Sequence, residues 1–322
     1  MKNILKKTLL LGTCLLSITG IHRSWAMSPP PPMMSVNVNP SSHVIGIGAP
    51  TQEGIGISLF TTSTNRSSLR MGTTDVDNIA NEERTDLQTT LLADYPLGKN
   101  TTLLLAIPYI NTDVSYTGVT QQVSGLGDIT LFGKYAFYQD RPITPTQELS
   151  GIVGVAFPTG STDEKDSAGA LLSTTQQLGS DTTDFLLGGA GIWRFAPFSF
   201  YGDMTYTING SASYKFGNQF VLNTGINYPL GPSFALVGEV NGRYGQQDSS
   251  DVLIGKVPNT GGTTLFLSPG VQWKPAGNWT LQLGVQLPVY QNFHDTQLAY
   301  DTNILFGIST RFGGGEKEGI MQ

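Results

Sequence analysis

Ten charged side chains recur within short runs of alternating apolar and polar residues, and they are the first candidates for chemistry in this chain. Five are basic and five are acidic: Arg84, Lys134, Arg194, Arg243 and Arg311, with Asp86, Asp94, Asp128, Asp203 and Glu239. Equal numbers of both signs do not form a ladder that would draw ions of one sign. They predict paired charges that brace or partly fill a narrow enclosed space.

Catalytic patterns are scarce by comparison. After residue 26 the chain has two histidines, and His294 with Asp295 is the sole histidine–acid neighbour pair. Adjacent side chains of a strand point to opposite faces, so these two cannot easily orient each other. No metal-ligand spacing, phosphate-binding glycine loop or nucleophile elbow occurs. We therefore predict no catalytic residue, metal or cofactor and expect no enzyme; a hydrolase that uses His294 is the weakest alternative.

Twelve runs of about ten residues carry the alternation, each ended by Gly, Pro, Asn or Asp, as in β-strands. They lie near 54–62, 84–95, 101–112, 127–138, 148–157, 184–195, 198–208, 219–229, 233–244, 263–273, 279–290 and 303–312. Asn209-Gly210 could also form a tight hairpin and turn 211–217 into a thirteenth strand. An even number is the bacterial pattern, so we predict twelve.

The connections alternate in length. Residues 96–100, 139–147, 196–197, 230–232 and 274–278 are short, whereas 63–83, 113–126, 158–183, 209–218, 245–262 and 291–302 are mostly long and polar. Soluble β-sandwiches have no reason to gather long loops at one end. Outer-membrane barrels pair short periplasmic turns with long extracellular loops. The sequence therefore predicts an all-β, transmembrane antiparallel β-barrel with both termini in the periplasm.

The stretch "GLGDITLFGKYAFYQD" (125–140) shows how the faces divide. Asp128, Thr130 and Lys134 fall on one side, with Leu131 and Tyr135 on the other. In the predicted barrel the polar side faces the lumen and the apolar side faces lipid. By the same rule, the ten charged residues are candidates for lining the lumen. Ten aromatic residues near the strand ends then form a girdle at the periplasmic interface: Tyr95, Tyr138, Trp193, Phe195, Phe198, Tyr228, Phe234, Trp273, Trp279 and Phe312.

The N-terminus has the order of a secretory signal, with three lysines before the apolar stretch 8–21 and small residues before a cut after Ala26. Its removal takes away Cys14, the chain's one cysteine, and leaves 14 basic against 24 acidic residues. Such an acidic chain is a poor ligand for nucleic acid. We divide the chain into a signal peptide (1–26), a proline-rich polar segment (27–52), the barrel (53–312) and a short tail (313–322).

Several short pieces resemble one known family. They are "GLGDITLFGKY" (125–135), "GVAFPTG" (154–160), "LFLSPGVQW" (265–273), "VQLPVYQN" (285–292) and "GISTRF" (307–312). They are similar to the outer-membrane barrels of the meta-pathway phenol-degradation family, often described as transporters. The resemblance implies an outer-membrane barrel in settings of aromatic-compound catabolism, one that moves small, rather hydrophobic solutes. One departure is that ten residues follow Phe312, the terminal aromatic by which such barrels are recognised for assembly.

Together these patterns predict an outer-membrane channel for passive uptake of small, aromatic or hydrophobic solutes. Its expected partners are membrane lipid, the solute and, during insertion, the barrel assembly machinery. The alternative from another class is a structural or adhesive barrel whose outer loops bind a partner. Residues 159–183 combine a charged start with the apolar Ala170-Leu171-Leu172, and the sequence leaves open whether this loop folds inward as a constriction or lies exposed.

Overall fold

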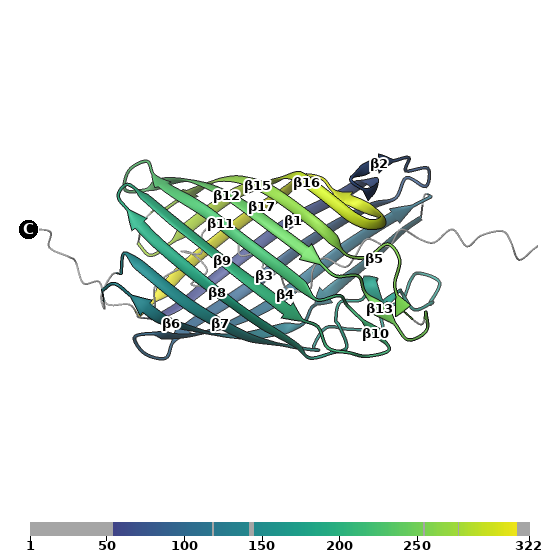
Figure 1. Cartoon of the computed structure of the whole chain (residues 1–322), viewed down its shortest axis with the longest axis horizontal. Coiled ribbons are helices and arrows are strands. Elements are labelled where there is room, and N and C mark those ends of the chain that lie inside the picture. Colours follow the sequence, from purple (N-terminus) through teal and green to yellow (C-terminus); the bar gives the residue numbers. More distant parts are fainter. Residues whose placement is uncertain (1–53, 118, 142–144, 254, 276, 314–322) are drawn as a thin grey trace, which may run out of the picture.

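The chain forms a closed antiparallel β-barrel (Figure 1). The computed structural model describes residues 54–313 apart from 118, 142–144, 254 and 276. The predicted signal peptide, proline-rich segment and nearly all of the tail lie outside these residues. Within the described part, η1 (Thr174–Gln176) is a single helical turn, and no helix is long and apolar enough to cross a membrane.

Twelve strands form the wall. They are β1 (Ile55–Gly72), β3 (Glu83–Pro96), β4 (Thr101–Tyr116), β6 (Ile129–Gln139), β7 (Gln147–Phe157), β8 (Asp184–Phe195), β9 (Phe198–Ile208), β11 (Gln219–Pro229), β12 (Phe234–Gly245), β15 (Gly262–Trp273), β16 (Thr280–Tyr300) and β17 (Asn303–Phe312). Each pairs antiparallel with its neighbour along the chain. Pairing of β1 with β17, from Ile55 opposite Phe312 to Ser63 opposite Ile304, closes the ring. The predicted fold and strand number are confirmed.

The remaining strands lie beyond the wall, among the long loops. They are β2 (Thr74–Val76), β5 (Val119–Leu126), β10 (Tyr214–Lys215), β13 (Ser249–Ser250) and β14 (Gly255–Lys256). Figure 1 shows the long loops gathered at one end of the barrel and the short turns at the other. β10 pairs with β13 in a small separate sheet, so the residues after Asn209-Gly210 add no thirteenth wall strand. Instead the Asn209 side chain donates to the Gly217 carbonyl and holds this loop in place.

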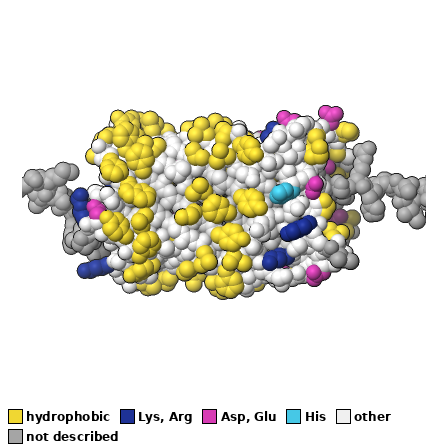
Figure 2. All heavy atoms as spheres, in the orientation of Figure 1, with side chains coloured by type: hydrophobic (Ala, Val, Ile, Leu, Met, Phe, Trp, Pro, Cys, Tyr) yellow, Lys and Arg dark blue, Asp and Glu magenta, His cyan; other side chains and the backbone are white. Residues whose placement is uncertain are grey.

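The two faces of the wall divide as the alternation predicts. On β6, Leu131 and Tyr135 are 41% and 54% exposed, whereas Thr130 and Lys134 are each 1% exposed. Hydrophobic side chains spread over the middle of the outer surface, and charged ones gather toward its ends (Figure 2). The inner face is mixed, because buried polar residues such as Thr130 and Lys134 lie there together with an apolar cluster that includes Phe60, Leu104 and Phe132. An apolar outside with buried charged groups inside is the arrangement that a lipid environment stabilises.

The ten predicted girdle aromatics are all exposed on the outer surface. Some pack against each other across strands: the Phe234 and Trp273 rings stack with centroids 6.1 Å apart, and the Phe198 and Tyr228 centroids lie 5.1 Å apart. Because these rings belong to strand ends beside the short turns, they form a belt near that end of the barrel. Amphipathic aromatic rings are favoured at such depths in a membrane.

Two strands are longer than their alternation predicts. β1 extends ten residues past Thr62 through a polar stretch, and β16 extends past Tyr290 and reverses direction near Asp295, whose φ is 60°. The first limb of β16 pairs with β15, and the second, Thr296–Tyr300, pairs with β1. Between the limbs, the side-chain amide of Gln291 makes the two hydrogen bonds that the backbone of a neighbouring strand would make. Its Nε2 donates to the Tyr300 carbonyl at 3.0 Å, and its Oε1 accepts from the Tyr300 N–H at 2.8 Å.

Candidate functional site

One side of the barrel interior is braced by ion pairs centred on Asp86. The Arg84 Nε lies 2.8 Å from this carboxylate, Arg66 Nη2 lies 3.3 Å from it, and the Thr112 hydroxyl donates to it at 2.7 Å. β1, β3 and β4 bring these four side chains together, and all four are buried. Arg66 also lies over the Tyr300 ring, 4.4 Å from its centroid.

Two further ion pairs lie on the same side of the interior. Lys134 Nζ is 2.8 Å from Glu148 Oε1, whose carboxylate also accepts from Ser150 and Gln139. Near the junction of β17 and β1, Arg311 Nη2 is 2.7 Å from Asp94 Oδ2. In these three ion pairs each carboxylate, Asp86, Glu148 and Asp94, lies beside at least one base.

The opposite side, from β9 to β17, carries an amide network instead. We use this name for Asn223, Asn241, Gln286 and Asn303 together with the groups that they contact. Asn241 Nδ2 donates to Asn223 Oδ1 at 3.0 Å and to Glu239 Oε2 at 3.1 Å, and Asn223 Nδ2 donates to Asp203 Oδ2 at 2.9 Å. Gln286 links Asn241 to Asn303. The Ser268 hydroxyl of β15 also donates to Asn241 Oδ1, so the hydrogen bonds run across six adjacent strands, from β9 to β17.

Asp203 and Glu239 form no ion pair with any described residue. Glu239 accepts a 2.6 Å hydrogen bond from the Tyr201 hydroxyl, and Asp203 accepts one from Asn223 Nδ2. Both carboxylates are buried within the wall. Of the ten predicted residues, Arg84 pairs with Asp86 and Arg311 pairs with Asp94, whereas no described cation forms an ion pair with Asp203 or Glu239.

Asp128 has a different role, at the long-loop end of β6. Its Oδ1 accepts from the Gly160 N–H and its Oδ2 from the Ser180 N–H, both at 2.9 Å. One buried carboxylate thus holds both ends of loop 158–183. At the other end of the barrel Arg194 is half-buried and donates to the Pro145 carbonyl, so it fastens a short turn.

Loop 158–183 is folded on itself. The N–H groups of Leu178 and Gly179 both donate to the Ser161 carbonyl at 3.0 Å. Leu172 and Leu178 are buried against Val123 of β5, while Leu171 is 64% exposed. The two alternatives for the apolar residues of this loop, burial or exposure, each apply to one leucine: Leu172 is buried in a small core, and Leu171 is on the surface.

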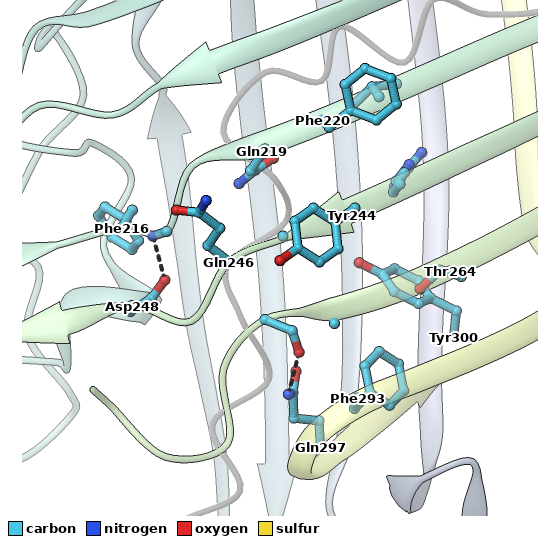
Figure 3. A pocket seen from close by; sticks show the side chains of 16 residues that line it. Phe216, Gln219, Phe220, Tyr244, Gln246, Asp248, Thr264, Phe293, Gln297 and Tyr300 are labelled. Carbon is cyan, nitrogen blue, oxygen red and sulfur yellow. Dashed lines mark hydrogen bonds between the residues drawn. The ribbon is translucent and has the colours of Figure 1, made fainter. Parts of the chain in front are cut away.

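A cavity of ≈ 70 Å³ lies at the long-loop end of the amide side. β11, β12, β15 and β16 supply most of the cavity's lining, which includes Arg243. Phe293 and Tyr300, both labelled in Figure 3, also line it. The Arg243 guanidinium also lies 5.2 Å from the centroid of the Phe266 ring. The cavity therefore combines aromatic faces with a cationic group, a combination suited to small rings with polar substituents.

Asp248 forms the loop side of the cavity. It accepts from the Tyr214 hydroxyl at 2.6 Å and from the Gly217 N–H at 2.7 Å, the second bond being drawn in Figure 3. Burial raises the pKa of its carboxyl above the usual range. Loss of water around Asp248 raises the cost of charging it more than its hydrogen bonds lower that cost.

The interior charges that were absent from the predicted set include Arg66 and Glu148. Arg66 lies in a stretch that the sequence assigned to a long connection, so no face could be given to it. Glu148 is the first residue of a predicted strand. Alternation places it on the same face as Ser150 and Ile152 and on the opposite face from Val153. The period-two rule would have placed it inside.

His294 lies exposed at the reversal of β16, and its backbone N–H donates to the Gly261 carbonyl at 3.2 Å. The neighbouring Asp295 carboxylate accepts from the Asn259 N–H. Among residues 54–313, apart from the gaps given above, no group of three or more His, Cys, Asp or Glu is arranged to hold a metal ion.

The architecture defines the class: this is an antiparallel barrel of the outer-membrane type with a polar interior. The family model described as "Putative MetA-pathway of phenol degradation" matches residues 60–300, and the chain belongs to that family. The family prediction is confirmed. No curated protein sequence matches the chain significantly.

Solved structures share the fold at low sequence identity. The COG4313 outer membrane channel from Pseudomonas putida F1 is 16% identical, with a TM-score of 0.63 over 80% of this chain and 96% of that one. The β domain of the Bordetella autotransporter BrkA is 11% identical, with a TM-score of 0.47 over 81% and 100%. The Ralstonia pickettii toluene transporter TbuX is 10% identical, with a TM-score of 0.43 over 85% and 94%.

Proposed function

We propose that this protein is an outer-membrane channel for passive uptake of small, aromatic or hydrophobic solutes. The observation that carries the proposal is the distribution of side chains on a closed barrel. Apolar side chains cover the outside. The inside holds charged groups and amides together with a buried apolar cluster that includes Phe60, Leu104 and Phe132, and it has an aromatic-lined cavity toward the long loops. An interior that combines polar groups with apolar surfaces, inside an apolar shell, gives a small aromatic solute a route through the barrel.

The family description supports the aromatic character of the solute, since it names phenol degradation. The cavity supports it independently through Phe293 and Tyr300. Its small volume favours small solutes, because a dry cavity of about 150 Å³ is what holds a single benzene ring. A ring would enter this cavity by widening it toward the loops.

The proposed orientation follows from the ends of the barrel. β1 begins at Ile55 and β17 ends at Phe312, and these two residues pair directly. They lie at the end of the short turns, which in bacterial outer-membrane barrels faces the periplasm. We therefore place both termini in the periplasm and the long loops outside the cell, after removal of residues 1–26.

Single-channel conductance in a planar bilayer tests the function. Protein that first shows the heat-dependent gel shift of a closed barrel should give steady current steps, and a small aromatic solute should reduce them. Asn223→Trp, on the inner face of β11, should lower the conductance by narrowing the interior. Leu222→Trp is its matched control, because this neighbour is 46% exposed on the outer face.

Silence from folded protein would reject the channel. In that case the binding of a partner through the outer loops becomes the stronger explanation, and removal of residues 159–183 should abolish that binding. If the two tryptophan variants lower the current equally, the interior assigned to Asn223 is not the conducting path.

A further inference from the structure

We propose that the outer face of the small sheet formed by β10, β13 and β14 binds a phosphorylated lipid of the outer leaflet, with Lys215 and Lys256 as the groups that hold the phosphate. The channel function makes no use of this surface. The inference rests only on the orientation proposed above, in which the long loops lie outside the cell.

The small sheet continues one part of the barrel wall. β10 precedes β11, β13 follows β12 and β14 precedes β15, so the order β10-β13-β14 repeats the wall order β11-β12-β15. Only the short segments 216–218, 246–248 and 257–261 join the two sheets. The small sheet therefore extends this part of the wall at the long-loop end (Figure 1).

Contacts on one face fix the orientation of the small sheet. The Tyr214 hydroxyl donates to Asp248 at 2.6 Å, and both Phe216 and Asp248 line the cavity. Side chains alternate between the two faces of a strand, so Lys215, which lies between Tyr214 and Phe216, points away from the cavity. Lys215 therefore lies on the side of the small sheet that continues the outer surface of the wall.

Strand register places a second lysine on this outer face. Ser249 of β13 pairs with Lys215 on one side and with Lys256 on the other. Paired residues share a face, and neighbouring strands lie about 4.8 Å apart, so the two lysine backbones are about 10 Å apart with a hydroxyl group between them. Lys256 Nζ also donates to the Gln247 carbonyl at 3.3 Å, which directs it toward β13. Two ammonium groups so placed can contact one phosphate from both sides.

The two lysines are available to an anion from outside the chain. Neither forms an ion pair with any residue that the structure describes, whereas Arg70, at the same end of the barrel, pairs with Asp75. Of the acids nearby, Asp248 is turned to the opposite face, where it accepts from Tyr214 and Gly217. Asp251 lies at the turn after β13.

The wall beside the small sheet offers an apolar surface to acyl chains. Phe220 and Tyr244 pair across β11 and β12 and are 36% and 42% exposed on the outer face. Phe220 follows Lys215 by five positions, so the two backbones are at most about 18 Å apart. Figure 2 shows basic side chains toward the long-loop end of the outer surface, beside hydrophobic ones. A lipid that has phosphate on its headgroup fits both surfaces, because its chains can lie along the rings while its phosphate meets the lysines.

Lipid binding by the full-length barrel in detergent micelles tests the inference. Folded protein, identified by its heat-dependent gel shift, is titrated with lipid A, and native mass spectrometry gives the Kd of the complex. Wild-type protein should bind lipid A more tightly than lipid A from which the phosphates have been removed. Raising the salt from about 0.1 M to about 1 M shortens the Debye length from about 10 Å to about 3 Å, so it should weaken wild-type binding.

The double variant Lys215→Gln/Lys256→Gln should raise the Kd for lipid A by about tenfold, because both charge-assisted contacts to phosphate are lost. Lys99→Gln/Lys274→Gln is the matched control. It removes the same charge from two exposed lysines of the short turns, and it should leave the Kd unchanged. Labelling of Lys256→Cys on intact cells by a membrane-impermeant thiol reagent should show that this face lies outside the cell.

Equal lipid A binding by the wild type and the Lys215/Lys256 double variant would overturn the inference, and so would an equal loss in the control variant. Wild-type binding that is indifferent to the lipid phosphates would do the same. If the double variant does not fold, the phosphate comparison and the salt dependence of the wild type decide. A barrel that binds lipid A through these lysines but passes no current would reject the channel and leave this inference in place.

Discussion

Lys134 Nζ lies 2.8 Å from Glu148 Oε1, and both side chains are almost completely buried inside the barrel. Asp128 directly precedes β6 and is in phase with Lys134, yet its carboxylate binds the backbone of loop 158–183 instead. The acid and the base of this run therefore have different roles. Lys134 joins two wall strands, and Asp128 joins the wall to a loop.

Breaking the Lys134–Glu148 pair should destabilise the barrel. Glu148→Gln leaves the buried ammonium without its carboxylate, and removing one partner of a buried pair costs about 3–5 kcal/mol. The midpoint of urea unfolding, followed by the heat-dependent gel shift, measures the loss. The exposed pair Arg70–Asp75 supplies the control, because Asp75→Asn should cost less than about 1 kcal/mol. Equal losses would show that the interior pair is as well hydrated as a surface pair.

Asp128→Ala should loosen the whole of loop 158–183. The change leaves the Gly160 and Ser180 N–H groups without an acceptor, at about 1–3 kcal/mol for each if it stays buried. Hydrogen exchange across the loop should accelerate, and limited proteolysis should cut it sooner. Asp166→Ala is the comparison, because Asp166 binds the N–H groups of Ala168 and Ala170 at the loop tip, and its loss should affect the tip alone. If the hydrogen exchange of the Ser180 amide is unchanged in Asp128→Ala, Asp128 does not hold this end of the loop.

Gln291→Ala should open the wall between the two limbs of β16. The amide of Gln291 meets both the N–H and the carbonyl of Tyr300, which a methyl group cannot do. Amide exchange at Tyr300 should rise, and the barrel should unfold at a lower urea concentration. Gln291→Glu keeps the acceptor and loses the donor, so we expect an intermediate effect. If alanine and glutamate behave alike, the Tyr300 N–H does not depend on this side chain.

The turn 140–146 should respond to acid through Asp140. The hydrogen bond from the Thr146 hydroxyl, followed by the Gln147 and Thr146 N–H groups, lowers the pKa of this exposed carboxyl. Because the folded pKa lies below the unfolded one, the stabilisation is complete above the usual carboxyl range and disappears as pH falls through the folded pKa. Protection of the Gln147 amide should therefore be high at about pH 5 and low at about pH 2.

Asp140→Asn provides the reference for that measurement, because an amide side chain does not titrate in this range. Its Gln147 protection should be lower than that of the wild type at about pH 5 and should not change with acid. If protection of the Gln147 amide falls equally with acid in both proteins, the effect comes from general loosening of this end of the barrel and not from Asp140.

The sequence predicted the wall closely because a barrel strand is specified locally. Polar and apolar residues must alternate when one face meets lipid and the other a polar interior, and turn residues must end each run. Leu131 and Lys134 could therefore be assigned to opposite faces from β6 alone. Where the alternation stops, the prediction stops as well, and so the extensions of β1 and β16 and the position of Arg66 were missed.

Pairing partners could not be predicted in this way. The rule of alternate faces places Lys134, Asp128, Asp94 and Glu148 inside the barrel, but the contacts among them depend on the stagger of neighbouring strands and the closure of β1 on β17. These are relations between residues far apart in the chain. The sequence alone determined which side chains face inward. The tertiary structure decided that one side of the interior holds ion pairs and the other an amide network, because strand register sets which charges come within contact distance.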